Sequence, residues 1–183
     1  MRLLKRNSIL SIFNNYLYDS LLPVNISYMY NLGSILGIIL IIQIVSGIFL
    51  AMYYIPNINM AFNSIEYIMR EVNYGWFIRY LHLNSAAFFF LAVYIHILRG
   101  LLYGSFNKRL TWIIGVILFL LMIITAFIGY SLVYGQMSYW AIVVITNLLT
   151  TIPIIGKTLV EFIWGSSSVS NATLNRLINR QIK

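Results

Sequence analysis

Three long runs of apolar residues, separated by short polar segments, dominate the pattern of this chain. The runs extend from Leu32 to Tyr54, from Tyr80 to Tyr103 and from Thr111 to Tyr134, with only isolated charges near their ends. A helix needs about 20 consecutive apolar residues to cross a bilayer. Because backbone polar groups must be hydrogen-bonded internally in lipid, each run is predicted to be a transmembrane helix.

Shorter amphipathic or apolar segments flank these runs. Apolar positions recur at near-helical spacing from Leu3 to Tyr18, which predicts a helix on the membrane surface, with a frayed terminus as the alternative. Gln136 to Leu149 and Ile155 to Trp164 are too short to cross, and we expect interfacial helices folded over the outer end. The predicted fold is an all-α integral membrane helix bundle. Its expected parts are a surface helix and lead-in (1–31), three transmembrane helices (32–134), interfacial helices (135–165) and a polar basic tail (166–183).

The composition supports a membrane protein. Hydrophobic residues make up 61% of the chain and charged residues 9%, whereas charged residues make up about 25% of an ordinary soluble domain. The chain contains no cysteine, which excludes disulfides, iron–sulfur ligation, thiolate-bound haem and c-type haem attachment by its own residues.

Basic residues indicate the orientation. They precede the first run and cluster around Lys108 and Arg109, so the positive-inside rule places the N-terminus and this loop on the inner side. The net charge of +8 is therefore an orientation signal with a possible attraction to anionic lipid. Nucleic-acid binding is disfavoured, because the basic residues are scattered along membrane boundaries.

The two histidines of the chain lie in the second run. His82 and His96 are fourteen residues apart, so on a helix they share one face and are separated by about 21 Å along the axis. Ionisable side chains inside a membrane are usually functional, and neutral imidazole is a common metal ligand. We therefore predict two metal centres stacked across the membrane; the alternative is two core histidines satisfied by ordinary hydrogen bonds.

Glycines repeat this interval in the other two runs. Gly33 and Gly47 are fourteen residues apart, as are Gly115 and Gly129. Each pair leaves two patches without side chains on one helical face, where the edge of a planar cofactor could approach the backbone. Close helix packing is the alternative explanation for any single glycine. The shared interval favours walls of two planar cofactor pockets.

Several segments together resemble mitochondrial cytochrome b, the quinone-binding, dihaem subunit family of ubiquinol–cytochrome c reductase. They are RYLHLN from Arg79, HILRGLLYGS from His96, GYSLVYGQMSYW from Gly129, NLGS from Asn31 and ITNL from Ile145. The resemblance runs in order from about residue 7 to Arg176. It implies two b-type haems, with His82 ligating the lower-potential haem near the intermembrane side and His96 the higher-potential haem near the matrix.

The resemblance also assigns other residues. The four glycines match haem-contact glycines, and Arg79 and Arg99 match basic residues that face haem propionates, although snorkelling to the interface would explain the same positions. It implies an outer quinol pocket and an inner, matrix-side quinone pocket. The expected outer residues are Phe127, Tyr130, Gly135, Ala141 and Ile145, and the expected inner residues are Ser20, Asn31, Ser34 and Gly37.

The chain departs from the family pattern at several positions. Ser85 and Ala141 stand where glycine is usual, and Ser166–Ser167 replaces a Gly-Gly-Phe run. The methyl group of Ala141 is expected to narrow the quinol pocket. The family's fourth helix supplies the second axial histidine of each haem, and Leu177 to Lys183 does not resemble it. We therefore expect the first three-helix portion of the protein, with a non-family tail from about residue 177.

The resemblance implies electron transfer from ubiquinol through two haems in a multi-pass protein of the mitochondrial inner membrane. Expected partners are an iron–sulfur protein, a cytochrome c-type subunit, quinone and lipid, in a dimeric complex; the isolated chain is expected to be inactive. One alternative is a haem-free fragment made as the exon-encoded leader of an intron-encoded splicing factor. A generic structural membrane subunit is another, which the shared fourteen-residue interval disfavours.

Overall fold

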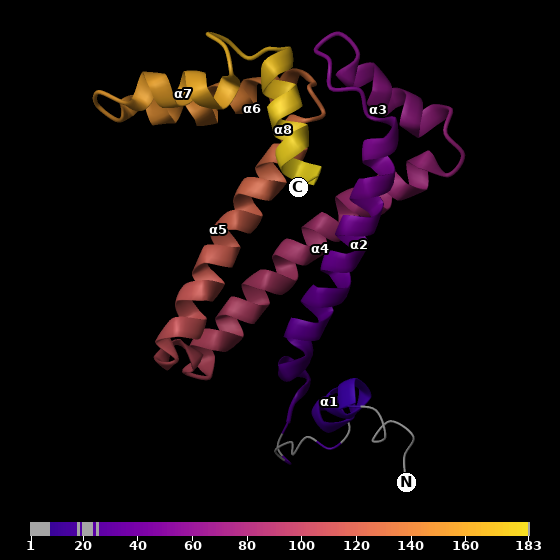
Figure 1. Ribbon diagram of the computed structural model, residues 1–183, viewed down its shortest axis with the longest axis vertical. Coiled ribbons are helices and arrows are strands. Elements are labelled where there is room, and N and C mark those ends of the chain that lie inside the picture. The colour runs from indigo at the N-terminus through magenta and orange to yellow at the C-terminus, as the bar shows by residue number, and fades with distance from the viewer. Residues whose placement is uncertain (1–7, 18, 20–23, 25, 183) are drawn as a thin grey trace.

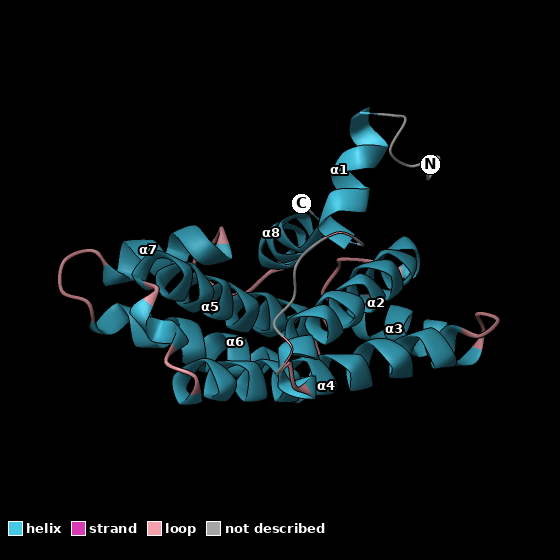
Figure 2. Cartoon of the chain, turned by 90° about the horizontal axis from the view of Figure 1, so that it is seen from below, coloured by secondary structure: helices cyan, strands magenta, loops and turns pink. Residues whose placement is uncertain are grey.

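The computed structural model describes residues 8–17, 19, 24 and 26–182, and all regular structure among them is helical (Figure 2). The α-helices are α1 (Ser8–Leu17), α2 (Leu32–Tyr53), α3 (Ala61–Arg70), α4 (Gly75–Leu102), α5 (Arg109–Ser131), α6 (Gln136–Asn147), α7 (Gly156–Trp164) and α8 (Asn171–Ile182). Three short 3₁₀ helices connect them, η2 (Tyr28–Asn31), η3 (Ser105–Asn107) and η4 (Leu148–Thr151). The helix α1 lies within the segment predicted to bind the membrane surface.

The three predicted transmembrane helices are confirmed as α2, α4 and α5, each long and apolar enough to cross a membrane. Their ends differ by more than two residues from the prediction at two places. The helix α4 begins at Gly75 rather than Tyr80, because a helix can continue through the mixed aromatic and polar residues of the interface. The helix α5 ends at Ser131, before Tyr134, whose positive φ of 52° interrupts helical geometry.

The shorter helices gather at the two ends of the transmembrane helices. Figure 1 shows α1 and the α4–α5 connection at one end, and α3, α6, α7 and α8 at the other. This arrangement agrees with the expectation that the N-terminal segment and the Lys108–Arg109 loop share one side of the membrane. The helices α2 and α4 cross along their lengths and form the main contact between transmembrane helices.

The main apolar core lies at the end occupied by α3, α6 and α8, rather than between the transmembrane helices. Its buried members are Ala61, Leu132, Ile142, Leu174 and Leu177. Tyr54, directly after α2, packs against this core and donates a hydrogen bond of 2.7 Å to the carbonyl oxygen of Leu132. The outer ends of α2 and α5 are thereby joined.

The expected polar tail contains a helix that packs against the rest of the chain. Along α8, Thr173, Leu174 and Leu177 are buried, whereas Asn175 and Arg176 are exposed. The helix contacts α5 and α7. Its amphipathic pattern therefore provides one apolar face for the outer core.

Hydrogen bonds between buried side chains connect α6, α7 and α8. The indole Nε1 of Trp164 donates to Thr146 Oγ1 at 3.0 Å, and Thr173 Oγ1 donates to the carbonyl oxygen of Trp164 at 2.8 Å. Gly165 ends α7 with a φ of +78°, and the guanidinium of Arg176 lies against it, where a Cβ would clash. These contacts fix the interfacial layer above α5.

Candidate functional site

His82 lies on α4 at the crossing with α2, and its imidazole ring packs directly against the α2 backbone. Ser46 Oγ is 2.8 Å from His82 Nδ1, and Ser46 is 3% exposed. A Cβ built on Gly47 would lie 3.3 Å from His82 Cε1, so this glycine permits the close approach of the ring. The ring nitrogen Nε2 has no hydrogen-bond partner among the described residues.

Two further polar side chains, Gln43 and Ser85, lie where α2 and α4 cross. Gln43 Nε2 donates to the carbonyl oxygen of His82 and to Ser85 Oγ, both at 2.9 Å. Ser85 Oγ in turn donates to the carbonyl oxygen of Leu81 at 2.6 Å. We call Gln43, Ser46, His82 and Ser85 the α2–α4 polar cluster. The serine that departs from the family's glycine thus has a defined place in it.

His96 has a different environment. It is exposed, and among residues that the structure describes it has no hydrogen-bond partner. Three residues further along α4, the guanidinium of Arg99 lies 4.4 Å from the ring centroid of Tyr30 and 5.0 Å from that of Tyr103. Arg99 Nε is buried and lacks a hydrogen-bond acceptor among the described residues. This orphaned donor suits an anionic group, such as a carboxylate, beside His96.

Arg79 lies near the other end of α4 and is three residues from His82, just as Arg99 is three residues from His96. It precedes His82 by three residues, which places the two side chains on neighbouring positions of one helical face. The side chain is half-buried, and no hydrogen bond between described residues involves it. Each histidine therefore has an arginine one turn away, towards the nearer end of the helix.

The predicted haem-contact glycines differ in what surrounds them. A Cβ at Gly33 or Gly115 would meet no atom within 4 Å, so neither glycine is required by packing within this chain. At Gly129 a Cβ would lie 3.8 Å from Gln181 Nε2, in ordinary contact with α8. Only Gly47, described above, is crowded, and there by the imidazole itself.

These residues fit haem better than a metal held by protein ligands alone. No group of three or more His, Cys, Asp or Glu that could hold a metal ion occurs in the described part of the chain. A single metal ion could be bound by only one of the two histidines, because they lie about 21 Å apart on the helix. A porphyrin brings its own equatorial ligands and needs only axial ones from the protein. The partnerless Nε2 of His82 could bind haem iron, and the orphaned Nε of Arg99 could pair with a haem propionate.

The outer quinone residues lie around the corner between α5 and α6. Phe127 and Tyr130 are on the last turns of α5, Gly135 is in the connection, and Ala141 and Ile145 are on α6. A Cβ on Gly135 would lie 3.6 Å from the ring of Phe62 in α3. The structure therefore brings the five residues to one end of the bundle.

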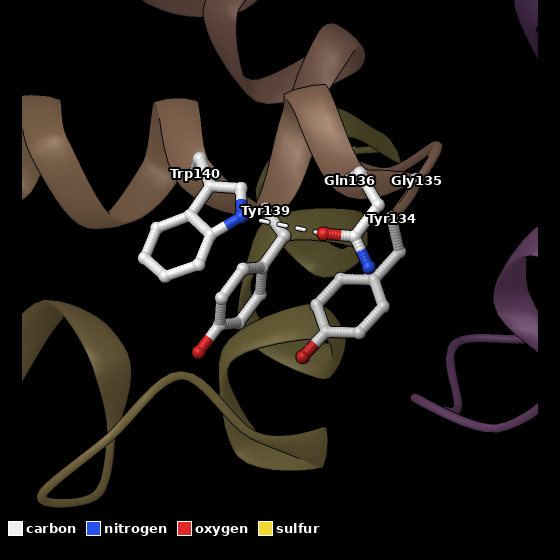
Figure 3. A pocket seen from close by; sticks show the side chains of 5 residues that line it. All are labelled: Tyr134, Gly135, Gln136, Tyr139 and Trp140. Atoms are coloured by element: carbon white, nitrogen blue, oxygen red, sulfur yellow. Dashed lines mark hydrogen bonds between the residues drawn. The ribbon is translucent and has the colours of Figure 1, made fainter.

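A hollow of about 320 Å³ opens at this corner (Figure 3). It is lined by Tyr134, Gly135, Gln136, Tyr139 and Trp140, and shares only Gly135 with the predicted quinol residues. The rings of Tyr134 and Tyr139 meet edge to face at 5.8 Å, and Trp140 Nε1 donates to Gln136 Oε1 at 3.3 Å. Burial, followed by the influence of Tyr139, raises the pKa of Tyr134. An aromatic hollow with neutral phenol donors suits a small planar ring.

The inner quinone residues lie at the start of α2, at the other end of the transmembrane helices from the α5–α6 corner. Asn31 ends η2, Ser34 and Gly37 follow in the first turns of α2, and all three are exposed. Ser34 Oγ donates to the carbonyl oxygen of Asn31 at 2.8 Å. Ser20 is outside the described residues. The three described members line the start of α2, and a Cβ at Gly37 would meet no atom of the described residues within 4 Å.

A family model described as "Cytochrome b/b6/petB" matches residues 17–180. The chain belongs to the cytochrome b family. Cytochrome b of the fungi Mycosarcoma maydis and Schizophyllum commune is 60% and 58% identical to this chain over 181 residues. These residues are 98% of this chain and 46% and 47% of the relatives, so the chain spans about half the length of the curated relatives it matches.

The fold is shared with solved members of the cytochrome b family. A chain of a structure titled "Hyperthermophilic respiratory Complex III" superposes with a TM-score of 0.87 at 31% identity. The match covers 97% of this chain and 49% of the other. With the fungal relatives and three apolar helices, it supports a multi-pass protein of the mitochondrial inner membrane.

Sequence analysis missed two members of the polar cluster, Gln43 and Ser46. Both are polar residues in a strongly apolar helix, three positions apart and therefore on one face. Such residues in a membrane helix usually bind another helix or a functional group. Their spacing could have indicated the face of α2 that meets His82.

Proposed function

We propose that this chain is a haem- and quinone-binding part of the cytochrome b subunit of a respiratory ubiquinol–cytochrome c reductase. The proposed activity of the subunit is electron transfer from ubiquinol across the inner membrane by way of two b-type haems. The observation that carries the proposal is the pair of imidazoles on one face of α4, about 21 Å apart, each with a ring nitrogen free to bind iron.

The residues of the chain have separate roles in this proposal. His82 and His96 would each supply one nitrogen ligand to haem iron, and Arg79 and Arg99 would pair with haem propionates. The glycines leave room for the edge of the porphyrin. A bound haem supplies a one-electron redox centre. The chain would offer one histidine to each of the two haems.

The two quinone sites are proposed to lie at opposite ends of the bundle. Phe127, Tyr130, Gly135, Ala141 and Ile145 would contact a quinol, which releases two electrons and two protons on oxidation. Ser20, Asn31, Ser34 and Gly37 would contact a quinone at the inner side. The separation of the α5–α6 corner from the start of α2 supports this assignment (Figure 1). An iron–sulfur protein and a cytochrome c-type subunit, in a dimeric complex, are the proposed partners.

Haem titration of the purified chain in detergent tests the proposal. Free imidazole is added in parallel samples to fill the axial position that the chain leaves open. We expect two haems per wild-type chain, one in either His82→Ala or His96→Ala, and none in the double variant. Low-spin spectra should appear when imidazole is present.

A displaced histidine provides the matched control. Adding Ile95→His to the His96→Ala variant keeps the number of histidines but rotates one imidazole by about 100° around α4. This variant should bind one haem, like His96→Ala. Two haems in His82→Ala, or no haem bound by the wild-type chain, would contradict the proposal, and the latter would favour a haem-free fragment.

A further inference from the structure

The position of one proton determines the tautomer of His82. Ser46 Oγ lies 2.6 Å from the carbonyl oxygen of Ile42 and 2.8 Å from His82 Nδ1. A carbonyl oxygen only accepts hydrogen bonds, so the single hydroxyl proton of Ser46 must lie between Oγ and the Ile42 oxygen. Otherwise two lone pairs would face each other at 2.6 Å. The proton of the Ser46–His82 contact therefore comes from Nδ1.

We propose that Ser46 is a positioning residue that holds His82 as the Nδ1–H tautomer and leaves Nε2 as its metal-binding nitrogen. This inference rests on the proposed function for the identity of the metal group, but its geometry belongs to the protein alone. Histidines that bind metals commonly donate their other ring N–H to a neighbouring acceptor, which fixes the tautomer and the ring orientation.

The rest of the α2–α4 polar cluster limits the movement of the ring. Gly47 lies against Cε1, so the Nδ1–Cε1 edge of the imidazole faces α2. Turning the ring over would place a carbon opposite Ser46 and remove the hydrogen bond. Gln43 binds the carbonyl oxygen of His82 and holds the α4 backbone in register with α2. Ser46 therefore acts on a ring whose position is already restricted.

The proposal makes the two histidines unequal. No hydroxyl or other hydrogen-bonding group of the described residues engages His96. Donation from Nδ1–H increases the electron density at Nε2 and the basicity of the ligand. The hydrogen bond to Ser46 is therefore expected to favour the oxidised state of a haem bound to His82. Replacement by alanine should raise the reduction potential of that haem only.

Nitrogen-15 NMR of the haem-free full chain in micelles gives the direct test. The chain has two histidines, so labelling this residue type gives two imidazole spectra, and His96→Gln assigns them. At about pH 8, where imidazole is neutral, we expect His82 to carry its proton on Nδ1. Ser46→Ala should lower the ratio of Nδ1–H to Nε2–H by about 2- to 10-fold, as expected for one net hydrogen bond.

Two variants separate this role from a general effect on folding. Ser46→Thr keeps the hydroxyl and should retain the wild-type tautomer. Thr125→Val removes an exposed hydroxyl that likewise donates to a carbonyl oxygen four residues earlier, that of Leu121, and should change neither histidine. Far-UV circular dichroism of each variant reports whether its helices remain folded.

The outcomes distinguish the two proposals. An Nε2–H tautomer of His82 in the wild-type chain, or an unchanged tautomer ratio in Ser46→Ala, would overturn the role of Ser46. If the tautomer behaves as expected but the chain binds no haem, the role of Ser46 stands and the proposed function fails.

Discussion

Replacing Thr146 by valine should loosen the interfacial layer that carries the proposed quinol residues of α6. Thr146 and Trp164 are 6% and 9% exposed, and the hydrogen bond between them joins α6 to α7. Valine has nearly the same shape but no acceptor. The indole N–H of Trp164 would then be buried without a partner.

The cost of leaving the indole N–H of Trp164 without a partner determines how strongly the substitution destabilises the contact between α6 and α7. The hydroxyl of Thr146 also donates to the carbonyl oxygen of Ile142 at 2.5 Å, but a carbonyl inside a helix keeps its backbone partner. Leaving one buried donor unsatisfied costs about 1–3 kcal/mol. Local opening of α6 and α7 should therefore become about 5- to 150-fold more frequent.

Amide hydrogen exchange of the chain in micelles, followed by mass spectrometry, measures this opening. Peptides from α6 to α8 should lose protection, while those from α2 and α4 should not. Thr150→Val is the matched control, because its hydroxyl is exposed and bonds only to the carbonyl oxygen of Asn147.

A double-mutant cycle with Trp164→Phe isolates the interaction. With both partners removed no donor is orphaned, so the effect of the double variant should be smaller than the sum of the single effects. Unchanged protection in Thr146→Val, an equal loss in Thr150→Val, or strict additivity would refute the argument.

Three further predictions concern topology, a glycine and a tyrosine. Because the chain has no cysteine, Asn73→Cys and Lys108→Cys can be labelled individually, and impermeant reagents should reach them from opposite sides of the membrane; labelling from one side would refute the topology. Gly33→Ala should stabilise α2 by about 0.5–1 kcal/mol in detergent unfolding, whereas Gly47→Ala should gain less, because its methyl would lie 3.3 Å from an imidazole carbon; equal gains would contradict this. Burial raises the pKa of Tyr54 to about 12. The stability contributed by the neutral Tyr54 hydroxyl should therefore be intact below about pH 10 and lost as the pH rises through 12. Tyr54→Phe should remove this pH dependence of unfolding.

The transmembrane helices could be predicted because lipid imposes a length and a composition on each of them. The helix α8 could not, because its sequence is mainly polar and its buried residues, Leu174 and Leu177, depend on partners distant in the chain. The early start of α4 at Gly75 was missed for a related reason. At the interface, a helix is no longer marked by continuous hydrophobicity.

The candidate site, like the fold, could be predicted only in part from the sequence. Regular helical spacing was sufficient to place His82 and His96 on one face of α4. Spacing within one helix does not show which residues of another helix face it, so the contacts of Ser46 and Gln43 with His82 required the packed structure. The fourteen-residue glycine interval predicted aligned positions but not the crowding at Gly47 alone.

The helix α5 is held by this chain mainly near its two ends. Among its residues only Ser131 is buried, and its most extensive contacts are with η3 at one end and with α6 and α8 at the other, while in its middle the ring of Phe119 meets that of Tyr94 in α4 edge to face at 6.1 Å. Leu118 and Leu121 in this middle part are 60% and 53% exposed, so substitutions between large apolar residues there should change little packing within the chain. Selection on that stretch must come from whatever surrounds the helix in the membrane, so the variation tolerated there would map the neighbours of α5 rather than its own fold.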